Sequence, residues 1–286
     1  MKKNNWLLFA FITTIFWGIW GAFIEIPEKA GFPATLGYVV WAITMIPCSL
    51  LALRYIKWKL EYDTKSIFLG SIIGILGAGG QLLLFQALKD GPAYIVFPLI
   101  SLFPILTIAL SMIFLKEEAS TKHWIGIIVA LIAIFLLSYQ PASTKESHGK
   151  IWLFLSIIVF MLWGLQAYVM KFSNATMKSE SIFFYMMITA VLLIPIALFM
   201  TDFSKQINWG LKGPYLATMI HFLNSVGALT LVYALRYGKA IIVVPMTGLS
   251  PLITIVISLI IYSIFPGLIL IIGMVFALTA IYLLSD

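Results

Sequence analysis

The chain has 286 residues, of which 62% are hydrophobic and 10% are charged, and its mean hydropathy is +1.06. Ordinary soluble domains carry about 25% charged residues, so this composition excludes that class and indicates a polytopic membrane protein. The net charge of +7 is distributed over helix ends and forms no run or patch, which argues against nucleic acid as a partner.

The membrane segments can be counted from the apolar stretches. A bilayer core about 30 Å thick needs about 20 apolar residues per crossing. In chain order the sequence predicts ten crossings, at 6–26, 33–53, 67–88, 93–115, 122–138, 151–171, 181–200, 213–237, 240–262 and 266–284. We expect the first to be a retained helix, because its apolar stretch exceeds the roughly 7–15 residues of a signal peptide.

The basic residues predict the orientation. With the N-terminus inside, twelve of the 18 Lys and Arg residues fall in inner loops and six in outer loops. The positive-inside rule therefore places both termini in the cytoplasm. We expect an integral protein of a bacterial inner membrane or plasma membrane.

The two halves of the chain repeat each other. At an offset of 147 residues "ALKDGPAYIVFPLISLFPILTIALSMIF" lies over "ALRYGKAIIVVPMTGLSPLITIVISLII", and at an offset of 146 "FWGIWGAF" meets "LWGLQAYV". This predicts two five-helix repeats, 1–140 and 141–286. Because five is odd, the second repeat enters the membrane from the opposite side, so the fold class is an all-α membrane protein built as an inverted repeat.

The repeated motifs resemble the drug/metabolite transporter superfamily, of the type with two EamA-like repeats. The matching residues in the first half are Trp17-Gly18, Pro98, Pro104, Glu117 and Gly126, and those in the second are Trp163-Gly164, Pro245, Pro251 and Gly273. Ile264 departs from the pattern, since it stands where Glu117 would repeat. We interpret Glu117 as an interfacial residue at a helix end.

Two prolines interrupt the fourth and the ninth predicted helix at the same positions. Each removes a backbone donor and leaves a carbonyl four residues earlier without its partner. Such a carbonyl is tolerated at membrane depth only where protein or a watery cavity receives it. We therefore predict that the helix breaks at Pro98, Pro104, Pro245 and Pro251 face a central pathway.

Polar and aromatic side chains near the helix midpoints are the candidates for substrate binding. They are Trp17, Trp20, Gln81, Tyr94, Ser101, Trp163, Gln166, His221, Asn224, Tyr233, Thr247 and Ser250. Two alternatives stay open: the polar groups bond neighbouring helices, and the tryptophans serve only as packing.

Two residues are candidates for proton coupling. His221 titrates near neutral pH, and Glu25 is a carboxylate close to the end of the first helix. Glu25 and Lys171 occupy equivalent positions of the repeat. The alternative for Glu25 and Lys171 is a charge that extends from a helix end to the interface.

The leading hypothesis is a secondary transporter of a small organic solute that works by alternating access. The resemblance implies an exporter driven by proton exchange. Rival hypotheses are an uptake permease, for example for a sugar, a flippase of lipid-linked molecules, an intramembrane enzyme and a receptor. No GxxxxGK[ST], GxSxG or HExxH motif occurs, which disfavours ATP use and catalysis.

We expect no cofactor and no metal, since the single cysteine and three histidines form no ligand cluster. The expected partners are a small-molecule substrate and the lipid bilayer. The oligomeric state is either monomer or homodimer.

Overall fold

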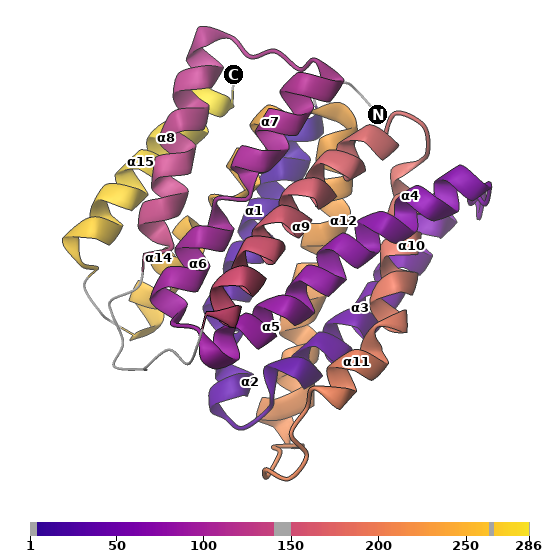
Figure 1. The fold of residues 1–286 in the computed structure, drawn as a ribbon, viewed down its shortest axis with the longest axis vertical. Helices are drawn as coiled ribbons and strands as arrows, with labels where there is room; N and C mark the ends of the chain where they lie inside the picture. Colours follow the sequence, from indigo (N-terminus) through magenta and orange to yellow (C-terminus); the bar gives the residue numbers. More distant parts are fainter. Residues whose placement is uncertain (1–4, 140–149, 263–265, 286) are drawn as a thin grey trace.

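The computed structural model describes residues 5–139, 150–262 and 266–285, and every regular element in those ranges is a helix. The helices form one bundle in which both chain termini lie at the same end (Figure 1). We call this the terminal end of the bundle, and the other the opposite end.

The first half supplies five helical runs, three of them built from more than one element. In chain order the elements are α1 (Trp6–Phe23), α2 (Glu25–Lys29), α3 (Ala34–Tyr55), α4 (Thr64–Gly74), the π-helical turn η2 (Ile75–Gly79), α5 (Gly80–Asp90), α6 (Ala93–Ser101), α7 (Pro104–Leu115) and α8 (Thr121–Leu137).

The second half follows the same order. Its elements are α9 (Ile151–Ser173), α10 (Ser179–Leu192), α11 (Ile194–Phe199), η3 (Leu211–Tyr215), α12 (Leu216–Tyr237), α13 (Ala240–Thr247), α14 (Ser250–Tyr262) and α15 (Leu268–Leu284).

Eight helical runs of the described chain are long and apolar enough to cross a membrane. They are Trp6–Lys29, Ala34–Tyr55, Thr64–Asp90, Ile95–Leu115, Ile151–Ser173, Ser179–Phe199, Leu211–Tyr237 and Ala240–Ile261. The other two predicted crossings, 122–138 and 266–284, form apolar helices of 17 residues each, α8 and α15. At 1.5 Å per residue they are about 25 Å long, a few ångströms less than the bilayer core.

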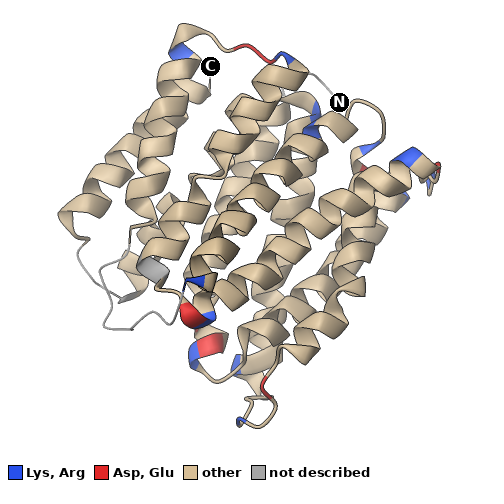
Figure 2. Cartoon of the chain, viewed as in Figure 1, with Lys and Arg blue, Asp and Glu red and all other residues tan. Residues whose placement is uncertain are grey.

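Charged residues gather toward the two ends of the bundle, and the belt between them is almost free of charge (Figure 2). Large apolar side chains cover that belt, among them Ile128, Phe154, Leu192 and Val275, which are all exposed. In water such a surface would be unfavourable. It therefore marks the part of the protein that contacts lipid.

The last helices of the two halves, α8 and α15, pack against each other along their length. A Cβ atom on Gly126, near the start of α8, would lie 2.9 Å from the Leu283 side chain at the end of α15. A Cβ atom on Gly273, near the start of α15, would lie 3.0 Å from Leu137 at the end of α8. The start of each helix thus contacts the end of the other, so α8 and α15 run antiparallel.

Both predicted helix breaks are present, each just before the second proline of its pair. α6 ends at Ser101 and α7 begins at Pro104, while α13 ends at Thr247 and α14 begins at Ser250. The first proline of each pair, Pro98 or Pro245, stays inside a helix. The carbonyl of Ile100, which Pro104 cannot satisfy, accepts instead from the N–H of Phe103 at 2.9 Å.

The breaks lie against protein. Phe103, at the first break, packs edge-on against Trp163 with ring centroids 6.1 Å apart. At the second break, Gly248 leaves so little room that a Cβ atom would lie 2.7 Å from Ile134 of α8. Whether these breaks line a pathway stays a prediction.

Candidate functional site

Two tryptophans at equivalent positions of the repeat make equivalent hydrogen bonds. Trp17 on α1 donates from Nε1 to the backbone carbonyl of Asn224 on α12, at 3.3 Å. Trp163 on α9 donates from Nε1 to the carbonyl of Gly77 in η2, also at 3.3 Å. Asn224 and Gly77 are themselves equivalent at the offset of 147 residues. Each tryptophan therefore bonds a helix of the other half.

The glycine after each tryptophan permits a close helix crossing. Gly18 packs against Ile253 on α14 so closely that no Cβ atom would fit. A Cβ atom on Gly164 would lie 2.8 Å from Leu106 on α7. The carbonyls of both glycines accept hydrogen bonds across the same crossings, from Thr254 Oγ1 at 2.9 Å and from Thr107 Oγ1 at 2.8 Å. Small residues allow this backbone approach in membrane bundles.

Glycines on the partner helices make room for the two indole rings. A Cβ atom on Gly227 would lie 2.5 Å from Trp17, and one on Gly80 would lie 2.5 Å from Trp163. The predicted aromatic pair thus lies in the core where α1 crosses the second half and α9 crosses the first. Both rings are half-buried, so they keep some exposed surface.

A third tryptophan holds His221. Trp20 Nε1 donates to His221 Nδ1 at 3.3 Å, and His221 is 6% exposed. The other ring nitrogen of His221, Nε2, lies 3.1 Å from the point where a Cβ atom on Gly37 of α3 would stand. His221 therefore sits where α1, α3 and α12 meet.

The remaining polar candidates differ in their burial and in their hydrogen-bond partners. Gln166 packs its amide against Gly77, beside Trp163, and Gln81 and Asn224 are half-buried on α5 and α12. The hydroxyls of Ser101 and Thr247 donate to carbonyls of their own helices, at 2.9 and 3.1 Å.

Of the other binding candidates, Ser250 is half-buried at the start of α14, with its carbonyl close to Gly18. The side chain of Tyr94 lies outside the described residues. Tyr233 belongs to a different place in the fold. Its hydroxyl donates to Glu180 Oε1 at 2.7 Å, and its ring stacks on Phe9 with centroids 5.1 Å apart. Twelve residues along α12 separate it from His221, about 18 Å.

Glu25, the second proton-coupling candidate, lies on the surface. Its side chain is 62% exposed and forms an ion pair with Lys29 one turn along α2. The structure therefore separates Glu25 from the tryptophan and histidine cluster. Of the two candidates, His221 is the one that lies between the helices.

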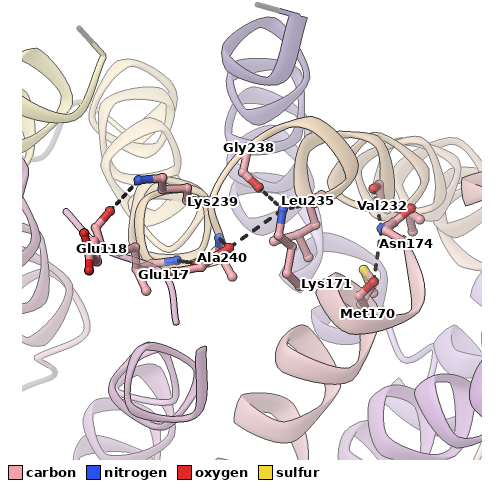
Figure 3. Close-up of polar contacts among 11 residues, drawn as sticks. Glu117, Glu118, Met170, Lys171, Asn174, Val232, Leu235, Gly238, Lys239 and Ala240 are labelled. Carbon is pink, nitrogen blue, oxygen red and sulfur yellow. Dashed lines mark hydrogen bonds and ion pairs between the residues drawn. The ribbon is translucent and has the colours of Figure 1, made fainter. Parts of the chain in front are cut away.

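A cluster at the terminal end of the bundle joins three segments distant in sequence (Figure 3). Lys116 closes α7 in a left-handed conformation, with φ of +52°, and turns the chain so that Glu117 reaches the start of α13. The two carboxylate oxygens of Glu117 accept from the backbone N–H groups of Ala240 and Ile241, both at 3.1 Å. A carboxylate in this position satisfies free backbone donors and favourably meets the helix dipole.

Lys171 completes this cluster. Its Nζ atom lies 3.7 Å from Glu117 Oε1 and donates to the carbonyls of Leu235 at 3.0 Å and Gly238 at 2.6 Å. The cation thus caps the end of α12 while the anion caps the start of α13. We call these two residues with the turn 238–239 the clamp.

The clamp corrects the interpretation of both residues as interfacial charges. The side chains are only 8% exposed for Glu117 and 21% for Lys171, because each finds several backbone partners inside the protein. The sequence carried a weak signal of this, because neither charge is kept in the other half. Glu25 stands at the position equivalent to Lys171, and Ile264 stands at the position equivalent to Glu117. Ile264 lies outside the described residues.

Sequence reasoning also missed two polar contacts at the terminal end. Asn174 Nδ2 donates to the Val232 carbonyl at 3.0 Å, and the Glu61 carboxylate accepts from the Ser181 hydroxyl. Neither residue belongs to a repeated motif. Across the ranges that the structure describes, no three His, Cys, Asp or Glu side chains lie close enough together to hold a metal ion.

Comparisons with known proteins place the chain. The sequence model of the EamA-like transporter family matches residues 4–139 and, a second time, residues 150–286. An uncharacterized protein of Methanocaldococcus jannaschii is 35% identical over 46% of this chain and 95% of its own length. An uncharacterized transporter of Archaeoglobus fulgidus is 32% identical over 48% of this chain and 48% of its own length.

Two further similarities are more distant. A probable 4-amino-4-deoxy-L-arabinose-phosphoundecaprenol flippase subunit ArnE of Hamiltonella defensa is 30% identical over 28% of this chain and 73% of its own length. A solved crystal structure superimposes with a TM-score of 0.79 over 99% of this chain and 96% of its own, at 14% identity. That likeness concerns the fold alone.

The packing of Trp163 against Gly80 can be tested with alanine substitutions at two neighbouring glycines. We expect Gly80→Ala to destabilise the protein by about 1–3 kcal/mol, because the new methyl group overlaps the indole. Gly79→Ala is the matched control, since nothing lies within 4 Å of its Cβ position; it should be neutral or stabilise by up to about 1 kcal/mol. Denaturant unfolding in detergent measures the stability of both variants, and equal effects would contradict the close packing of Trp163 against Gly80.

The clamp can be tested by breaking one partner at a time. Removing one member of a buried pair costs about 3–5 kcal/mol, and we expect Lys171→Met to approach the lower value because part of Lys171 is exposed. Glu117→Gln should be similar, and the double variant should recover part of the loss. Glu25→Gln at the exposed pair is the control, with an effect below about 1 kcal/mol. Additive losses in the double variant would show that the pair is not coupled.

Proposed function

The chain belongs to the EamA-like transporter family, whose model matches both of its halves, and from this we propose that it is a secondary active transporter of a small organic solute. The two repeats, 1–140 and 141–286, act as two inverted five-helix halves that make ten crossings. Cargo binds between them and is released on either side by alternating access.

The observation that carries this proposal is the reciprocal pair of contacts made by Trp17-Gly18 and Trp163-Gly164. The same hydrogen bond and the same helix crossing occur twice, each between a helix of one half and the helices of the other. The antiparallel contact of α8 with α15 supports the inversion, because equivalent helices of an inverted repeat run in opposite directions. The relative from Methanocaldococcus jannaschii, which aligns over 95% of its length with 46% of this chain, supports the repeat as a unit.

The clamp supports alternation between two states. At the terminal end, Glu117 and Lys171 hold the turn between α12 and α13. At the opposite end the equivalent turn, between α5 and α6, has Pro92 in place of Lys239 and the exposed Glu25 in place of Lys171. The two ends are therefore stabilised differently, as a transporter captured in one of its states would be.

The orientation and the direction of transport belong to the proposal. Most described Lys and Arg residues lie toward the terminal end, which by the positive-inside rule is the cytoplasmic side. The membrane is a bacterial inner or plasma membrane, and the cargo moves outward in exchange for protons.

His221 is the proton carrier that this geometry favours. An indole N–H can only donate, so Nδ1 of His221 accepts from Trp20. Protonation of the ring would place a proton on Nδ1, and two donors would then face each other. Binding a proton at His221 therefore breaks this one hydrogen bond between α1 and α12, which links protonation to the helix that bridges the halves.

The test is flux in proteoliposomes that contain the purified full chain. A thermal-shift screen of metabolites supplies a cargo, and uptake of that radiolabelled cargo is measured with and without an imposed pH gradient. We expect the gradient to drive accumulation by the unaltered protein. His221→Gln should abolish gradient-driven accumulation and retain counterflow at zero gradient, because glutamine keeps an N–H donor but cannot take up a proton.

Trp58→Phe, at a tryptophan that is 60% exposed, is the control and should leave both fluxes unchanged. Gradient-driven accumulation that survives His221→Gln would contradict the assignment of the proton carrier. Binding of a metabolite without any counterflow would contradict the transporter itself.

A flippase of lipid-linked molecules is the second candidate. It is favoured by the similarity to a probable flippase subunit over 28% of this chain. Movement of a fluorescent undecaprenyl-phosphate sugar between leaflets, without counterflow of soluble cargo, would select it.

A further inference from the structure

Two ring N–H donors, one on α3 and one on α12, are buried, and the described residues offer no acceptor to either. They are Nε1 of Trp41 and Nε2 of His221. A buried donor without a partner costs about 1–3 kcal/mol, and the membrane interior supplies no water to replace it. Each such group in a native structure calls for an explanation.

Three other buried polar atoms without partners are hydroxyl oxygens, on Ser49, Ser111 and Ser173. A hydroxyl rotates freely and can turn to a carbonyl of its own helix. A ring N–H cannot, because the ring plane fixes its direction. The two nitrogen donors are therefore the ones that require an external acceptor.

The proton on His221 is placed by its neighbour. Nδ1 accepts the Trp20 N–H at 3.3 Å, so the neutral imidazole carries its proton on Nε2. The Nε2 atom lies against Gly37 on α3, where an added Cβ atom would be 3.1 Å away. The absence of a side chain at Gly37 lets the imidazole approach α3 this closely.

Trp41 lies one turn further along the same face of α3. Gly37 faces His221, and Thr44 bonds Ser225 of α12 through hydroxyls 2.9 Å apart. Trp41 stands between those two positions, about 6 Å from Gly37 along the helix axis. Tyr38 packs edge-on against its indole ring at 5.4 Å and forms an aromatic wall.

We propose that the Trp41 Nε1–H and the His221 Nε2–H form a two-donor site that binds an uncharged carbonyl or amide oxygen of the cargo. The segments that build it, 6–23, 34–53 and 216–235, contain no Asp, Glu, Lys or Arg. While His221 is neutral, a carboxylate or phosphate here would be buried without a counter-charge, which is far more costly than burying a neutral acceptor. The surrounding Trp20, Tyr38 and Trp41 rings suit an aromatic or apolar body on the same molecule.

This inference deepens the proposed function, because it assumes that the occupant is the transported cargo. Its test is therefore made on binding alone, so that each claim can fail separately. Binding that depends on Trp41, without any flux, would support the donor site and contradict the transporter. Flux of a cargo whose binding does not depend on Trp41 would support the transporter and contradict the donor site.

The experiment uses the full chain in nanodiscs, labelled with ¹⁵N on its indole nitrogens, and three probes of similar size. N-methylbenzamide offers a neutral carbonyl, benzoate a carboxylate and ethylbenzene no acceptor. We expect N-methylbenzamide to shift the Trp41 indole N–H resonance downfield and to bind about three- to tenfold more tightly than ethylbenzene. Benzoate should bind most weakly.

Trp41→Phe keeps the aromatic ring and removes the donor, so it should weaken N-methylbenzamide about three- to tenfold and leave ethylbenzene unchanged. Gly37→Ala would place a methyl group 3.1 Å from Nε2 and should weaken both probes. Trp58→Phe is the control and should change neither. The resonance shift in the unaltered chain keeps the test valid if Trp41→Phe fails to fold.

Three results would overturn the site. They are equal affinity for ethylbenzene and N-methylbenzamide, tighter binding of benzoate, and a Trp41 resonance that is already hydrogen-bonded without probe and does not respond to it. The last would mean that a structural water alone satisfies the donors.

Discussion

The hydrogen bonds from Trp17 to the Asn224 carbonyl and from Trp163 to the Gly77 carbonyl connect the two halves of the protein. Since lipid is as apolar as the side chains, no hydrophobic force holds membrane helices together, and close packing and hydrogen bonds have to do so. The glycines that follow the two tryptophans let α1 and α9 approach α14 and α7 closely enough for the Thr254 and Thr107 hydroxyls to bond. The same contacts therefore occur twice, once at each crossing between the halves.

The clamp and the buried His221 contact α12 at different depths of the bundle. Glu117 and Lys171 fix the turn from α12 to α13 at the terminal end. Nearer the middle, Trp20 and His221 tie α1 to the same helix α12. α12 thus receives contacts from the bridging helix α1, from α9 and, through the clamp, from the chain after α7. α12 therefore connects the Trp20–His221 contact with the clamp.

The sequence predicted the helices and the repeated helix crossings better than it predicted the contacts of the polar residues, for physical reasons. The offsets of 146 and 147 residues found Trp17, Trp163 and their glycines, because crossings shared by two repeats constrain both copies. They could not tell which helices these residues contact, since a repeat fixes equivalence and not pairing. The apolar pattern found the helices, although α8 and α15 proved shorter than a full crossing.

Single-copy features were beyond such reasoning. Glu117 was interpreted as interfacial because it ends an apolar run, whereas the left-handed Lys116 turns it inward to α13. Glu25 looked equivalent to Lys171, yet it pairs with Lys29 on the surface. The missing acceptors of Trp41 and His221 are visible only in the structure, because both residue types are usually satisfied by neighbours that a sequence does not specify.

The central claim, that two related halves alternate between two states, is tested most directly by distances measured at both ends of one molecule. Spin labels would replace Glu118 and Ala175 at the terminal end, or Lys89 and Lys205 at the opposite end, so that each pair joins the two halves, with Cys48→Ala removing the single cysteine. Pulsed electron spin resonance in nanodiscs then gives both distance distributions. The account predicts two populations in each, with acid or cargo lengthening one distance while the other shortens. A single population at both ends, or distances that lengthen together, would contradict it.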